Sequence, residues 1–309
     1  MNLLAASNPM DHVYQWAYQH YPVGTPDNVF TPNGQITLVS NHIVMQVGAA
    51  VLLILLIPLF ARIRRTGNVV NDLTPRGFGN ALEAICSYLR DNVAKPTLGE
   101  HTDRFIGYVW TAFFYVFFVN LLGLLPLEPI TKGLVKSIYP EAHHGVGGAA
   151  TGNIWTTGTL ATCTLIMIVV NGLRLNGFAY IKHFFQGPIF IAPMIAVLEV
   201  IGLFAKCFAL TVRLFANMVA GHVLLAVLLS FIGLSYGALG TGPAAGIGIV
   251  VVLVSTAFNL LELFVALLQA YIFTFLTTLF IGQAVVIHHE HHDDHHEHDE
   301  EHAHAAHAH

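Results

Sequence analysis

Residues 190–230 form an apolar stretch that is too long to cross a membrane once in an upright position. A helix of about forty residues would run about 60 Å, whereas the hydrocarbon core of a bilayer is about 30 Å thick. The stretch also carries Glu199, Lys206 and Arg213, whose spacing of seven residues places them on one helix face. A charge at bilayer depth costs roughly 2.5 kcal/mol or more, so it must be paired, enclosed by protein or functional.

The composition places this stretch in a membrane protein. Of the 309 residues, 55% are hydrophobic and only 10% are charged, and the mean hydropathy is +0.63. A soluble domain carries about 25% charged residues, so we favour a polytopic membrane protein over a soluble protein with a large core. The 13 Lys and Arg residues form no dense basic patch, which argues against nucleic-acid binding. We expect no metal site and no cofactor, because the three cysteines are far apart and lack a ligand spacing.

Five apolar segments predict five membrane helices, at 41–61, 104–126, 154–173, 188–231 and 246–287. The last two are about forty residues each, and no proline falls between Pro193 and Pro243 to break the first of them. We therefore predict an all-α polytopic membrane protein whose last two helices form a long, strongly tilted hairpin, with a turn over 235–248.

Other segments flank this membrane domain of residues 41–287. Residues 1–40 are predicted to be an outer segment that contains a short amphipathic helix at 11–21. Residues 77–100 show helical spacing of apolar side chains and predict an interfacial helix that ends near Pro96, whereas 127–152 predict an outer loop. Residues 288–309 consist largely of histidine and acidic residues, which cannot build a core and predict a disordered tail.

Basic residues predict the orientation in the membrane. Arg62, Arg64 and Arg65 follow the first span directly, and Arg174 and Lys182 follow the third. Because Lys and Arg favour cytoplasmic loops, we expect the N-terminus outside and the C-terminus inside.

Arg213 is the residue that most needs a partner. Arginine keeps its proton under any plausible burial, and its own helix carries no acid within one turn. Two alternatives remain open: an internal ion pair with Glu262 on the last helix, or a fixed cation that faces a mobile carboxylate on another subunit.

A second polar group lies on the helix face opposite the arginine. His222 is nine residues beyond Arg213 and so points to the opposite face, while Glu262 and Gln269 share a face of the last helix. Histidine titrates near neutral pH and burial raises the pKa of a carboxylic acid, so His222 with Glu262 is predicted to relay protons. The alternative is a histidine with a purely structural helix contact.

Three segments carry a resemblance to a known family. Residues 210–222 read LTVRLFANMVAGH, residues 268–274 read LQAYIFT, and residues 118–126 read FVNLLGLLP. Together they resemble subunit a of the F-type ATP synthase, over roughly residues 40–287. The sequence departs at two points: some bacterial members have the His222 and Glu262 residue types exchanged, and some carry an acid where Gly123 stands.

The resemblance implies the stator of a rotary proton channel, with no catalytic site of its own. Arg213 would separate two half-channels and interact with the carboxylates of a c-ring. The proton path would include His222, Glu262, Asn217, Gln269, Asn120 and Glu199. Asn217, His222, Glu262 and Asn120 would line the inlet, and Glu199 the exit.

The resemblance also implies partners and a location. The partners are the c-ring, the peripheral-stalk b subunits and, indirectly, the F1 sector. The location is a bacterial inner membrane, or alternatively the mitochondrial inner membrane. An ion-coupled secondary transporter is the alternative function; it is disfavoured because neither inverted repeats nor interrupted helices are evident.

Overall fold

The computed structural model describes residues 17–22, 35–60, 77–125, 127–138, 145–177, 192–239 and 241–285. Within these residues, five helical segments are long and apolar enough to cross a membrane. Four of them are the single helices α1 (Asn41–Phe60), α7 (Ile154–Asn176), α9 (Ala192–Leu239) and α10 (Thr241–Val285). The fifth consists of α5 (Thr102–Leu124) and the helical segment before it. The prediction of an all-α polytopic membrane protein with five membrane helices is confirmed.

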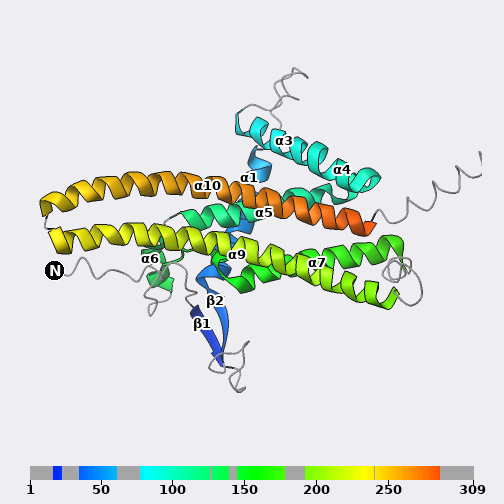
Figure 1. Ribbon diagram of the computed structural model, residues 1–309, viewed down its shortest axis with the longest axis horizontal. Helices are drawn as coiled ribbons and strands as arrows, with labels where there is room; N and C mark the ends of the chain where they lie inside the picture. The colour runs from blue at the N-terminus through cyan, green and yellow to red at the C-terminus, as the bar shows by residue number, and fades with distance from the viewer. Residues whose placement is uncertain are drawn as a thin grey trace, which may run out of the picture.

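The two longest helices, α9 and α10, lie side by side along the long axis of the molecule, and α1 crosses them (Figure 1). They contain 48 and 45 residues, which corresponds to about 72 and 68 Å of helix. Pro193 and Pro243 both fall in the first turn of a helix, where the missing N–H breaks no helical hydrogen bond. The predicted hairpin is confirmed, but the turn predicted over 235–248 is wrong in extent, since both helices continue into it.

The amphipathic segment before α5 falls within the predicted range of 77–100 but is made of three pieces. It consists of α3 (Phe78–Tyr88), a π-helical turn (Leu89–Ala94) and α4 (Lys95–Leu98). Pro96 lies near the start of α4, where its missing N–H is tolerated, and α4 ends two residues later, so the prediction of a helix end near Pro96 is confirmed. The chain turns at Gly99, whose φ of 54° is readily adopted only by glycine.

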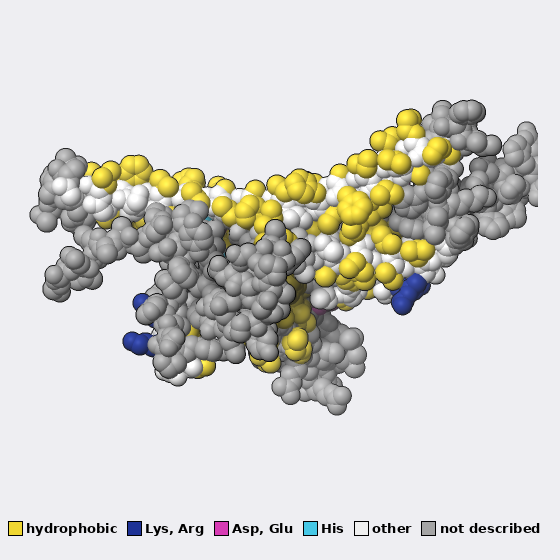
Figure 2. Space-filling view, turned by 90° about the horizontal axis from the view of Figure 1, so that it is seen from below, with side chains coloured by type: hydrophobic (Ala, Val, Ile, Leu, Met, Phe, Trp, Pro, Cys, Tyr) yellow, Lys and Arg dark blue, Asp and Glu magenta, His cyan; other side chains and the backbone are white. Residues whose placement is uncertain are grey.

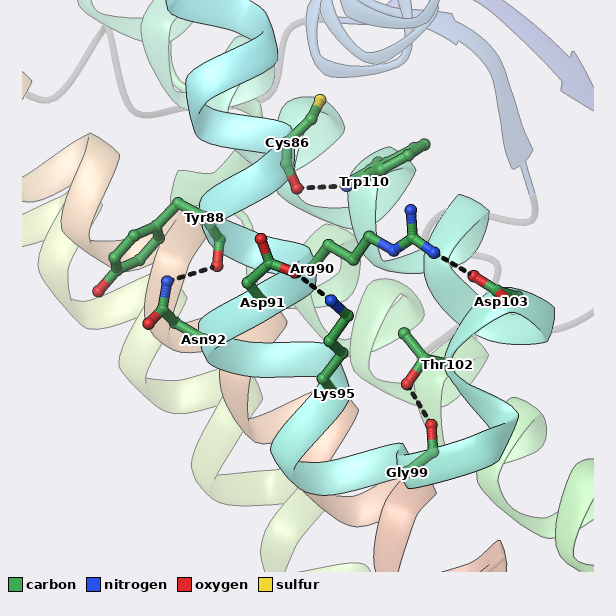
Figure 3. Close-up of polar contacts among 10 residues, drawn as sticks. All are labelled: Cys86, Tyr88, Arg90, Asp91, Asn92, Lys95, Gly99, Thr102, Asp103 and Trp110. Carbon is green, nitrogen blue, oxygen red and sulfur yellow. Dashed lines mark hydrogen bonds and ion pairs between the residues drawn. The ribbon is translucent and has the colours of Figure 1, made fainter.

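Polar contacts connect this segment to the start of α5 (Figure 3). The Arg90 guanidinium donates to the Asp103 carboxylate at 2.6 Å, and the Trp110 indole N–H donates to the Cys86 carbonyl at 3.1 Å. Exposed ion pairs contribute only about 0–1 kcal/mol each, so burial contributes more to holding the segment in place. The buried residues of the segment are Leu89, Val93, Ala94 and Leu98.

The main core lies where α5 meets α9 and α10. Leu210 and Leu214 of α9 are 2% and 1% exposed and pack against aromatic side chains of the other two helices. Phe113 and Phe114 of α5 form an edge-to-face pair with ring centroids 5.2 Å apart. These contacts fix the rotation of α9 about its axis and so decide which of its polar side chains face protein.

The N-terminal part differs from the prediction. β1 (Ala17–Pro22) pairs antiparallel with β2 (Gln35–Ser40), which leads directly into α1. The helix predicted over 11–21 is therefore wrong for residues 17–21, where Tyr18 and Tyr21 favour a strand once β2 provides a partner. The rest of that predicted helix lies outside the described residues, as do Arg62, Arg64, Arg65, Lys182 and the tail 288–309.

The predicted outer loop at 127–152 contains regular structure. α6 (Leu127–Ile138) exposes Lys132 and Lys136 and buries Val135. A 3₁₀ turn, η5 (Ala150–Gly152), is buried among α1, α5, α7 and α9. The glycines of this region indicate a loop by composition, but their small size also lets the chain return into the helix bundle.

The surface of the long helices is strongly apolar. Figure 2 shows hydrophobic side chains along the length of the molecule, with Lys and Arg at only a few positions. Phe208 of α9 is 67% exposed, and Leu253 and Phe264 of α10 are 67% and 62% exposed. Such a continuous apolar surface suits contact with lipid or with other membrane-embedded chains.

Gly282→Ala is expected to weaken the docking of α10 on α4. A Cβ at Gly282 would collide with the backbone carbonyl oxygen of Thr97, which cannot move as a side chain could. Such overpacking costs about 1–3 kcal/mol, so thermal unfolding of the purified protein in detergent should begin several degrees lower. Gly107→Ala in α5 is the matched control, because no atom lies within 4 Å of the added Cβ; equal unfolding temperatures for the two variants would contradict the prediction.

Candidate functional site

The site is built on the antiparallel contact between α9 and α10. Three pairs of polar side chains meet across it: Lys206 with Gln283, Asn217 with Gln269, and His222 with Glu262. As the residue number rises along α9, it falls along α10 by about the same amount. The two helices therefore keep one register over several turns, and the polar groups lie along a single seam.

The pair of the seam in which both side chains can gain or lose a proton is His222 with Glu262. The His222 Nδ1 atom lies 3.0 Å from the Glu262 Oε1 atom, and His222 Nε2 lies 3.3 Å from the carbonyl oxygen of Gly123 in α5. Glu262 is 8% exposed, and its second carboxylate oxygen, Oε2, has no hydrogen-bond partner in the described part of the chain. Three helices thus hold one histidine and one carboxylate in direct contact.

Hydrogen-bond chemistry restricts the proton positions of this pair. A carbonyl oxygen can only accept, so the contact with Gly123 places a proton on His222 Nε2. The proton between Nδ1 and Oε1 can then belong either to the histidine or to the acid, and the pair has zero net charge in both cases. A proton can therefore move between the two groups without leaving a net charge in the membrane.

One turn toward Arg213, a second contact crosses the seam. The Asn217 amide Nδ2 donates to the Gln269 Oε1 atom at 2.8 Å. Gln269 is 2% exposed, and its Nε2 atom has no acceptor among the residues that the structure describes. A buried amide with an unpaired donor is costly in a purely structural role, which favours a functional one.

Arg213 is placed apart from these pairs. It is exposed on α9, and no ion pair to it is found within the described ranges. The register of the seam brings Phe273 and Thr274 of α10 to its level, whereas Glu262 is engaged with His222. Of the two alternatives for Arg213, the internal pair with Glu262 is not formed.

Other predicted residues lie on either side of this region. Asn120 of α5 is 2% exposed and accepts a hydrogen bond from Thr151 of η5 at 2.9 Å. Glu199 lies exposed on the first turns of α9. Lys206 donates to Gln283 at 3.1 Å and lies 4.9 Å from the Phe280 ring centroid. The structure therefore joins Asn217 to Gln269 and His222 to Glu262, but leaves Glu199 and Arg213 outside these contacts.

Two glycines permit the site. Gly221 precedes His222, and a Cβ there would collide with the Glu262 carboxylate. At Gly123, a Cβ would come 2.7 Å from Met218 Cε and 3.1 Å from the Ala149 backbone. An acid at position 123 would not fit this packing, and the Gly123 carbonyl contacts His222 instead. Both glycines lie in segments that carry the family resemblance, but the sequence around Gly123 does not indicate its close approach to Met218 and Ala149.

Metal binding finds no support in this geometry. Within the described ranges, no group of three or more His, Cys, Asp or Glu side chains is placed to hold a metal ion. The site consists of amides, one imidazole, one carboxylate and a separate guanidinium.

This fold and site define a polytopic membrane protein in which one long helix carries a histidine that contacts a carboxylate of the next helix and, on another face, an arginine that has no ion pair among the described residues. The family described as ATP synthase A chain matches residues 43–282. The chain is 38% identical to ATP synthase subunit a of Myxococcus xanthus, over 82% of this chain and 75% of that protein. It is 35% identical to ATP synthase subunit a 2 of Prosthecochloris aestuarii, over 89% and 80% of the two chains. The chain therefore belongs to the ATP synthase A chain family.

Gly221→Ala is expected to separate Glu262 from His222. The added Cβ would lie 2.9 Å from Glu262 Cδ and closer still to Oε1. The carboxylate would have to move, leaving buried polar atoms unpaired at a cost of about 1–3 kcal/mol. Thermal unfolding in detergent should show this loss, and the shorter side chain of Glu262→Asp should recover part of it in the double variant.

The matched control for this test is Gly233→Ala on the same helix, where nothing lies within 4 Å of the new Cβ. It should be neutral or slightly stabilising, because alanine favours helix more than glycine does. Equal destabilisation by both substitutions would refute the proposed contact.

Proposed function

We propose that this chain is the stator of a proton channel in an ATP synthase, where it delivers protons to and from the carboxylates of a rotating c-ring. One half-channel opens to the outside and contains His222, Glu262, Asn217, Gln269 and Asn120. A second opens to the inside and includes Glu199. Membership of the ATP synthase A chain family and the arrangement of polar groups along the α9–α10 seam support this proposal.

The separation of Arg213 from the His222–Glu262 pair is the observation that carries the proposal. A guanidinium cannot give up its proton, so it cannot relay one. It can attract a passing carboxylate and favour its ionised form, which releases a proton toward the exit. The same fixed charge repels protons that would otherwise pass directly from one half-channel to the other.

The inlet pair has the complementary chemistry. It can hold one proton with no net charge, and Glu262 Oε2 has no partner in the described part of the chain. A second proton that arrives at the pair gives it a positive charge, which is unfavourable in the membrane. One proton therefore leaves from Glu262 Oε2 to an acceptor on a neighbouring subunit. The c-ring carboxylate is that acceptor, and each proton that crosses 100 mV supplies about 2.3 kcal/mol.

The shape of the long helices fits a stator. Both α9 and α10 are uninterrupted, whereas secondary transporters usually bind ions at helices broken near the midplane. A steeply tilted helix can follow the curved wall of a ring over a long distance. Exposed apolar side chains of α9, such as Phe204 and Phe208, suit a sliding contact with such a partner.

The bacterial relatives and the membrane helices favour a multi-pass protein of the bacterial plasma membrane. We propose that its N-terminus is outside and its C-terminus inside. The b subunits of the peripheral stalk would hold the chain against rotation, and the F1 sector would couple to it indirectly.

Arg213→Ala and Arg213→Gln are expected to abolish ATP-driven proton pumping. Without the fixed cation, ring carboxylates would keep their protons and the half-channels would lose their separation. The measurement is quenching of a pH-sensitive dye in inverted membrane vesicles, normalised to the amount of assembled complex. Arg90→Gln is the matched control, because that arginine makes only an exposed ion pair; normal pumping by either Arg213 variant would overturn the assignment.

Neutral replacements of the inlet pair are expected to slow proton uptake more than proton release. His222→Ala and Glu262→Gln should each lower uptake from the outer side at least about tenfold, the effect of one lost hydrogen bond to a charged group. Because both act on one contact, the double variant should be little worse than either single variant. Passive proton flux through the membrane sector in both directions, after removal of F1, measures this; strictly additive losses would contradict a shared relay.

A further inference from the structure

His42, at the start of α1, is a buried histidine that the proposed channel does not yet use. Asn41 and His42 are 2% and 1% exposed, although they open a membrane helix. The Asn41 Nδ2 atom donates to the Gly147 carbonyl at 3.2 Å, and Asn153 Nδ2 lies 3.3 Å from His42 Nδ1. The start of α1 is thus fixed against the segment that leads into η5.

The hydrogen bonds define the proton position on this histidine. Asn153 Oδ1 accepts from the Trp155 backbone N–H at 2.9 Å, so Asn153 Nδ2 is the group that donates to His42 Nδ1. The neutral ring must then carry its proton on Nε2. That buried N–H finds no acceptor among the described residues. An unpaired buried donor is costly, and an internal water is the usual partner for such a group.

Polar groups continue from His42 toward the inlet pair. Thr151 lies two residues before Asn153 in the buried segment and donates to Asn120 Oδ1 at 2.9 Å. Asn120 is one helical turn before Gly123, whose carbonyl contacts His222 Nε2 at 3.3 Å. Three polar layers therefore follow one another, formed by α1 with the loop, by η5 with α5, and by α9 with α10.

We infer that His42 is a positioning residue at the outer end of the proton inlet, where its Nε2–H holds an internal water from which protons pass toward Asn120 and the His222–Glu262 pair. This inference rests on the proposed function. It assigns a role in proton uptake to the first membrane helix, which the sequence motifs around Arg213 do not reach.

Two substitutions separate water positioning from packing. His42→Leu fills a comparable volume without a donor, whereas His42→Gln keeps an amide N–H. Outer-side proton uptake per assembled complex should fall about tenfold in the leucine variant, as expected for one lost hydrogen bond, and recover largely in the glutamine variant. Wild-type uptake per complex in His42→Leu would overturn the inference, and so would an equal loss in both variants.

Water access can also be tested directly. In a background that replaces Cys86, Cys163 and Cys207 with alanine, His42→Cys should react with a membrane-impermeant methanethiosulfonate added from the outside, and the reaction should block proton flux. Met45→Cys is the matched control, since Met45 lies one turn deeper on α1 in an apolar cluster and should stay unmodified. Modification only from the inside, or modification with unchanged flux, would overturn the role of His42.

The outcome remains distinct from that of the proposed function. If Arg213→Ala abolishes pumping while the His42 variants behave as wild type, only this inference fails. If Arg213→Ala pumps normally, the channel assignment itself fails whatever His42 shows.

Discussion

The contact between α9 and α10 is the interaction on which the rest of the structure depends. Because both helices are continuous, one register joins Asn217 to Gln269 and His222 to Glu262. The same register brings Phe273 and Thr274 of α10 to the level of Arg213, so the seam offers this cation no acid at that level. A kink in either helix would change the register beyond it and bring different side chains together. Uninterrupted apolar sequence is thus a requirement of the site as well as of the membrane.

The two kinds of charge near this seam have different physical costs. A buried carboxylate and a histidine in contact can share one proton and remain neutral as a pair, so they tolerate a position that is 8% exposed. A guanidinium has no neutral form available, and Arg213 is found on an exposed face instead. In the membrane that face meets either lipid or another protein. The high cost of a cation in lipid favours a protein partner that brings an anion.

Sequence patterns predicted the parts of this structure that depend on one helix at a time. The nine-residue spacing predicted different faces for Arg213 and His222, as the structure has them, and the lack of internal proline correctly predicted that α9 is continuous. The patterns could not predict contacts between distant segments. The buried turn η5 has the glycine content of a loop, and β1 needs β2 before its tyrosines favour a strand. Position 282 requires glycine because the Thr97 carbonyl lies against it. His42 gave no signal because its burial depends on Asn153, far along the chain.

Close packing and polar chemistry support each other at the inlet. Gly123 brings the backbone of α5 against Met218 and Ala149, and the same close approach presents its carbonyl to His222. Gly221 gives the Glu262 carboxylate the room to reach that histidine from the other side. Because neither glycine has a side chain, the α5 carbonyl and the Glu262 carboxylate can both reach His222. The backbone carbonyl thus makes the contact with His222, and an acid at position 123 is unnecessary here. A backbone carbonyl cannot titrate, so it orients His222 without competing for the proton, and the choice of proton acceptor is left to Glu262.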